Sequence, residues 1–121
     1  MLVLVGCGSG TPDEPKLPES ATPGWTRKSF AKSEAPAGLP AGAKPECWKA
    51  AYASTGDAQV WACGYAQESS AFDAMQRARA EADTVKFQEG KFLVIVQWHG
   101  VTRDEITALV RAVQRNLKVK R

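Results

Sequence analysis

The chain has 121 residues, of which 44% are hydrophobic, so it is long enough for one domain with one modest core. Its 16 basic and 13 acidic residues give a formal net charge of +3, an excess too mild to indicate nucleic acid as a partner. A basic cluster does end the chain, where cations suit the negative end of a helix dipole; anionic lipid or nucleic acid is the alternative reading of that cluster. No run approaches the ~20 apolar residues of a membrane-spanning helix.

The first residues of the chain contain a predicted localisation signal. Residues 4–7 read LVGC, and this tetrapeptide resembles the bacterial lipobox: an aliphatic residue, a small or aliphatic one, Gly or Ala, then Cys. The resemblance implies that the thiol of Cys7 receives a diacylglyceryl group and that the signal is cut just before it. Gly8 and Ser9 after the cysteine resemble lipoproteins that are sent on to an outer membrane. We therefore expect a lipid-anchored protein on the extracytoplasmic side of a bacterial envelope, in the periplasm if the host has two membranes.

Residues 1–6 then form a truncated signal peptide, since their apolar stretch is shorter than the usual ~7–15 residues. Two other interpretations of this region compete. The run GCGSG resembles a nucleotide-binding glycine loop, but three prolines between residues 12 and 18 prevent the helix that such a loop needs. A plain structural strand is the other alternative.

Residues 7–45 have the composition of a tether. All seven prolines of the chain lie between Pro12 and Pro45, and Gly, Ser, Thr and charged residues fill most of the remainder. Such a segment buries too little apolar surface to offset the entropy of ordering it. Residues 25–31 could still form a short strand, and we expect the folded domain to begin near Glu46 and to fill residues 46–121.

Two runs of strand-forming residues, 47–54 and 59–65, predict a first hairpin. A turn centred on Gly56 and Asp57 would place Tyr52 opposite Trp61 and Trp48 opposite Tyr65. These four aromatic side chains have two interpretations. They either pack the hairpin and the core, or form a partly exposed binding surface for a partner, a glycan or a lipid.

Cys47 and Cys63 are the two cysteines that remain after Cys7, and an even pair in an exported domain indicates a possible disulfide. The hairpin register just described opposes this, because it places Cys63 across from Ala50 and points Cys47 to the other face. A three-residue loop or a bulge would restore a common face. Two buried free thiols are the alternative.

A helix should follow from Ser69 or Ser70 to about Ala82, with Phe72 and Met75 on its inner side. Residues 84–88 and 91–99 then predict a second hairpin around Glu89 and Gly90. Its register pairs Phe87 with Phe92 and Val85 with Val94. The face with these residues, Val96 and Trp98 is the expected core side, and Leu93, Ile95 and His99 lie on the opposite one.

The last helix has the clearest pattern. Thr102 and Glu105 form a capping box, and an apolar stripe at helical spacing follows it: Ile106, Leu109, Val110, Val113 and Leu117. The order of these elements predicts an α+β fold, ββαββα, in which a four-stranded, mostly antiparallel sheet has two helices on one face. Residues 65–72 and 86–94 also resemble, loosely, uncharacterised domains of bacterial secreted proteins and lipoproteins, which implies only the same fold.

No pattern in the sequence predicts catalysis. His99 is the only histidine, and it stands at a strand end without an obvious nucleophile; we expect no catalytic residue, no metal and no cofactor. We expect a binding or envelope-assembly module whose partners are the membrane, through Cys7, and an unidentified envelope protein. The alternatives are a structural protein that self-associates through the sheet face around Leu93 and Ile95, and a small exported enzyme.

Overall fold

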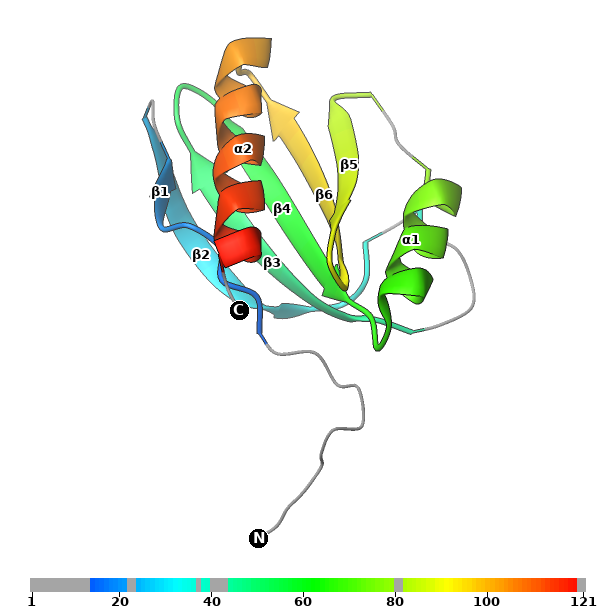
Figure 1. The fold of residues 1–121 in the computed structure, drawn as a ribbon. Helices are drawn as coiled ribbons and strands as arrows, with labels where there is room; N and C mark the ends of the chain where they lie inside the picture. Colours follow the sequence, from blue (N-terminus) through cyan, green and yellow to red (C-terminus); the bar gives the residue numbers. More distant parts are fainter. Residues whose placement is uncertain (1–13, 22–23, 37, 40–43, 80–81, 120–121) are drawn as a thin grey trace, which may run out of the picture.

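The computed structural model describes residues 14–21, 24–36, 38–39, 44–79 and 82–119, which form one antiparallel sheet and two helices (Figure 1). In chain order the elements are β1 (Ser20–Ala21), β2 (Trp25–Ser33), β3 (Glu46–Ala53), β4 (Asp57–Gly64), α1 (Glu68–Arg77), β5 (Thr84–Glu89), β6 (Phe92–His99) and α2 (Arg103–Val119). The strands lie in the order β1-β2-β3-β4-β6-β5, and the sheet curls into a half-barrel around α2. The predicted α+β class is confirmed, but the sheet has six strands and the predicted four-stranded sheet is wrong.

The two extra strands come from the segment that the composition assigned to a tether. The possible strand at residues 25–31 is present as β2, which pairs along most of β3, and β1 pairs with the start of β2. Leu17, Ala21 and Trp25 are buried in the main core. The folded unit therefore begins well before Glu46. A few apolar side chains are enough to hold this proline-rich segment on the sheet, because they pack into the core that the rest of the half-barrel forms.

The first hairpin has a different register from the predicted one. A three-residue turn, 54–56, joins β3 and β4, and the strands pair from Ala53 with Asp57 onward. Tyr52 therefore lies opposite Ala58 rather than Trp61, and Trp48 opposite Ala62 rather than Tyr65. The predicted register was displaced by three positions, and an odd displacement exchanges the two faces of a strand.

Gly56 explains the tight turn. A Cβ at this position would overlap the carbonyl O of His99 and the backbone of Gly100. Only glycine allows the β3–β4 turn to approach the end of β6 this closely.

The second hairpin keeps its predicted faces. Glu89 pairs with Phe92 across a turn of Gly90 and Lys91, which displaces the register by two positions from the predicted one. An even displacement leaves every side chain on its face. Val94 and Val96 are fully buried in the main core, as predicted.

The final helix also forms as predicted. The amide N of Thr102 donates to Oε1 of Glu105 over 2.9 Å, and the amide N of Glu105 donates to Oγ1 of Thr102 over 3.2 Å, so the capping box is confirmed. The apolar stripe of α2 packs against the sheet face that carries Val94 and Val96, with Leu109 and Val113 fully buried.

The first helix lies on the opposite face, so the prediction of two helices on one face is wrong. α1 packs through Ala71 and Ala74 against Leu93 and Cys63, whose side chains alternate with those that face α2. The buried residues of α1 are Ala71 and Ala74, and Met75, predicted to face inward, packs half-buried against the same cluster. Phe72, predicted to face inward, is 49% exposed.

Candidate functional site

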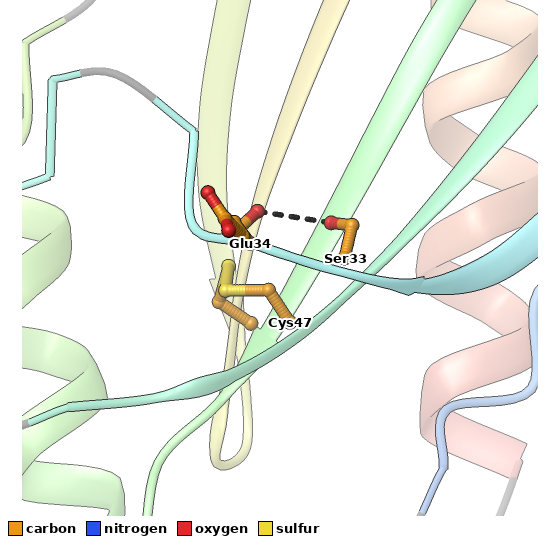
Figure 2. The surroundings of a disulfide bond; sticks show 4 residues. Ser33, Glu34 and Cys47 are labelled. Atoms are coloured by element: carbon orange, nitrogen blue, oxygen red, sulfur yellow. Dashed lines mark hydrogen bonds between the residues drawn. A yellow bond between two sulfur atoms is a disulfide. The ribbon is translucent and has the colours of Figure 1, made fainter.

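Of the predicted site residues, Cys7 lies outside the described residues, and its lipidation stays a prediction. Cys47 and Cys63 are joined by a disulfide, which links directly paired positions of β3 and β4. The bond lies beside the end of β2, where Oγ of Ser33 donates to the carbonyl O of Glu34 over 2.9 Å (Figure 2). The three-residue turn puts both cysteines on one face, which removes the objection from the predicted register. Because Cys47 and Cys63 are 2% and 0% exposed, this bond acts as a brace and not as a reactive pair.

The four aromatic residues considered as a binding surface do not share one. Trp48 and Tyr52 lie on the face that α2 covers, whereas Trp61 lies on the opposite face with Lys49 over its ring. Tyr65 is buried in the cluster under α1. Packing therefore accounts for three of these four side chains.

Both tyrosines behave as core residues. The hydroxyl of Tyr52 donates a 2.6 Å hydrogen bond to the carbonyl O of Pro18, which ties the N-terminal segment to β3. Burial raises the pKa of Tyr52 far above its usual value, with the nearby Arg27 opposing the shift, and burial also raises the pKa of Tyr65. Neither phenol is placed to exchange protons near neutral pH.

The two side chains proposed for self-association are buried. Leu93 is 0% exposed under α1, and Ile95 is 6% exposed. His99, at the end of the same strand, is exposed, and its Nδ1 lies 3.7 Å from Oδ1 of the exposed Asp57. Within the described ranges, no cluster of three or more His, Cys, Asp or Glu side chains could hold a metal ion.

A groove on the other side of the sheet was not predicted. It has a volume of about 590 Å³ and is lined by residues of α2, β5 and β6. Its lining residues are Asp83, Thr84, Val85, Trp98, Arg103, Ile106, Thr107, Val110, Arg111 and Gln114. Val85, Trp98 and Val110 are only half-buried, so they give the groove an apolar floor that a ligand could cover.

The rim of this groove is mainly basic. Arg103 and Arg111 are exposed on the α2 wall, and no ion pair or hydrogen bond involves either of them within the part of the chain that the structure describes. Asp83 is the one carboxylate among the lining residues that the structure describes. The groove therefore presents apolar surface between charges that favour an anionic partner.

The α2 wall is held in place at its N-terminal end. Oε2 of Glu105 accepts hydrogen bonds from the hydroxyls of Thr55, at 2.9 Å, and Ser54, at 3.2 Å, both in the β3–β4 turn. Nε1 of Trp25 donates to the carbonyl O of Glu105 over 2.8 Å. The hydrogen bonds from Thr102 and then Thr55 hold the pKa of Glu105 below its usual value. A carboxylate thus fixes the start of α2 to the hairpin.

The other wall is an open strand edge. Among the described residues, β5 is the last strand of the sheet, and β6 is the one strand that pairs with it. On the α1 side, Nζ of Lys86 donates to the carbonyl O atoms of Met75, at 2.7 Å, and Ala78, at 2.6 Å, and so closes the C-terminal end of α1. These contacts hold β5 in place from the side opposite the groove.

A smaller hollow of about 330 Å³ lies on the face opposite to α2. Its lining includes Trp61 and Ile95, which are paired across β4 and β6, together with Gln59 and Gln97, which are the next pair on that face. The groove beside α2 is the better candidate because it is larger and adjoins the open edge of β5.

Sequence reasoning missed the groove because it depends on strand order. Nothing in residues 84–89 indicates that this strand ends the sheet, and the arginines of α2 are also typical of any solvated helix face.

Among the described residues, no helix combines the length and the apolar character that crossing a bilayer requires. The sequence matches no family model, and comparison with curated proteins and with solved structures finds no significant match.

Proposed function

We propose that this chain is a binding module, anchored by a lipid at Cys7 on the extracytoplasmic side of a bacterial membrane, that holds an envelope protein in the groove between α2 and β5. The observation that carries the proposal is the groove itself: an apolar floor, two unengaged arginines and an open strand edge meet there. Binding sites of this kind combine apolar surface with a few polar groups that orient the ligand.

Two independent features support the proposed location of the protein. The lipobox-like residues 4–7 supply the anchor. The Cys47–Cys63 disulfide supports an oxidising compartment, because cytosolic thiols are normally kept reduced. The outer membrane is the destination if the host has one.

No observation specifically supports either of the two alternative functions. The self-association alternative placed its contact at Leu93 and Ile95, and both side chains are buried. An enzyme would need a nucleophile placed with His99, whose nearest charged neighbour is Asp57 at the exposed end of the sheet.

The anchor is tested by the intact mass of the protein extracted from bacterial membranes, expressed with a complete signal peptide. We expect a mass that begins at Cys7 and carries the diacylglyceryl group. The Cys7→Ser variant should keep its signal peptide and lack the mass of the diacylglyceryl group. An unmodified Cys7 in the mature protein would contradict the lipoprotein proposal.

Binding is tested by photo-crosslinking in intact cells. A photoreactive amino acid replaces Gln114, on the groove wall, or Ser29, which is exposed on β2, in two otherwise identical proteins. We expect one discrete adduct from position 114 and none from position 29. Equal labelling from both positions, or adducts from position 29 alone, would exclude the groove as the binding site.

A further inference from the structure

We propose that the groove binds an extended, acidic segment of the partner protein, and that this segment adds to the sheet as a seventh strand along the outer edge of β5. The inference rests on the proposed function, because it names the partner chemistry of the same groove. It concerns how the segment is held: by backbone hydrogen bonds from β5, by apolar side chains in the groove, and by the arginines of α2.

The backbone of β5 is arranged for such an addition. In an antiparallel pair, successive residues point their N–H and C=O groups alternately toward and away from the neighbouring strand. The amide N of Trp98 donates to the carbonyl O of Asp83 over 3.1 Å, so Asp83 points toward β6, and the register continues this pattern to Val85, Phe87 and Glu89. The backbone groups of Thr84, Lys86 and Gln88 therefore point away from β6. Within the described chain, no strand pairs with them.

The groove receives the side chains of the added strand. Side chains alternate between the two faces of a sheet, so every second residue of the segment would point toward α2. There it would meet the half-buried Val85, Trp98 and Val110. A strand bound at an exposed sheet edge gains affinity from main-chain hydrogen bonds and specificity from such pockets.

The basic side chains on the groove wall favour an acidic segment as the ligand. Arg103 and Arg111 stand on the α2 wall, eight positions apart, which is about 12 Å along a helix. Lys86, the cation of β5 itself, is already engaged with the carbonyl groups of α1. Carboxylates on the bound segment would meet the two arginines, whereas a basic segment would be repelled by them.

A second copy of this chain fits the edge less well. A two-fold pairing of β5 with β5 would place both α2 helices on the same face of the joined sheet, and with them the groove-lining Arg103 and Arg111 of both copies. Like charges would then gather in the place where an acidic segment would neutralise them. The partner is therefore expected to be a different protein.

The test uses a phage library of random peptides of about eight residues, long enough to run the length of β5, selected on the immobilised full chain. We expect the selected sequences to alternate apolar with other residues and to be rich in Asp and Glu. Binding of a selected peptide should weaken about tenfold in the Arg103→Glu/Arg111→Glu variant, a change of about 1.4 kcal/mol. The control is Lys28→Glu, which reverses an exposed charge on β2, away from the groove lining, and should leave the affinity unchanged.

Several outcomes would overturn the inference: selection without enrichment of acidic residues, equal loss of affinity in the Lys28→Glu control, binding of anionic lipid vesicles but not of the peptides, or dimers of the chain that peptides cannot dissociate. If any of these occurs while position 114 still gives its discrete adduct in cells, the binding-module proposal stands and only the strand-addition inference fails. Loss of both results would remove the groove from consideration.

Discussion

Leu109→Ala is the sharpest test of how α2 packs on the sheet. Leu109 lies in the middle of the buried stripe of α2, is 0% exposed, and belongs to the same core cluster as Val60, Val94 and Val96. The sheet beneath it is braced by strand pairing on both sides of β4 and β6. The surroundings therefore have little freedom to collapse into the space that the missing side chain leaves.

The cost follows from what is removed. Leucine loses three carbon atoms on replacement by alanine, and each buried methylene is worth about 0.8 kcal/mol, so the transfer contribution is about 2.4 kcal/mol. The residual cavity adds to this, which gives a total within the usual range of about 2–5 kcal/mol. A domain of about 100 residues loses about 4–8 °C per kcal/mol, so the melting temperature should fall by about 10 °C or more.

The assay is thermal and urea unfolding followed by circular dichroism, with Thr107→Ala as the control. Thr107 is exposed on the same helix, so its replacement removes little contact and improves helix propensity. We expect a change well under about 1 kcal/mol for the control. Equal unfolding midpoints for the two variants would refute the packing of α2 through this stripe.

The other predictions concern three separate supports of the fold. Replacing Cys47 and Cys63 together by alanine should cost about 3 kcal/mol in urea unfolding, because the bond closes a loop of 16 positions; an unchanged midpoint would contradict the bracing role. Glu105→Gln should remove a pH-dependent stabilisation that is complete above the ordinary carboxyl pKa of 4.5 and disappears as the pH falls through the lowered pKa of the folded state; parallel stability–pH curves for wild type and variant would argue against it. Gly56→Ala should cost about 1–3 kcal/mol in the same assay, because the new Cβ overlaps backbone that must shift, whereas at Gly90 a Cβ meets nothing within 4 Å and only the backbone strain of a φ of +60° should appear.

The sequence predicted the elements whose information is local. The capping box of Thr102 and Glu105 needs only four consecutive residues, and the stripe through Leu109 follows from the helical repeat alone. The two faces of the second hairpin also followed from alternation, and they survived an error of two positions in the register. The local sequence pattern was sufficient wherever a single helical or strand repeat determines which face of the element is buried.

Features that depend on turn geometry or on distant contacts were missed. The first hairpin depends on how closely Gly56 approaches the backbone at His99, which lies 43 positions later in the chain. The N-terminal strands depend on Trp25, whose ring nitrogen bonds to the carbonyl of Glu105 at the start of α2. α1 contacts the sheet through Ala71 and Ala74, whereas Phe72, the larger apolar residue that the pattern placed inward, is exposed.

The four aromatic residues predicted as a possible binding surface do not share one, for the same reason. Aromatic content pointed to Trp48, Tyr52, Trp61 and Tyr65, yet large aromatic side chains fill cores as readily as they form surfaces. The groove instead depends on which strand ends the sheet and on what lies beside it. Strand order arises from long-range pairing, and a single sequence does not display it.

The central claim is that β5 is an open edge that receives a partner, and amide hydrogen exchange along β5, resolved by residue in the full chain, tests it most directly. In the free protein, the amides of Thr84, Lys86 and Gln88 should exchange much faster than those of the intervening residues, which point toward β6. Addition of a selected acidic peptide should slow the fast set and leave the slow set nearly unchanged. Uniform protection along β5 in the free chain, or fast exchange that persists with the peptide bound, would contradict the account.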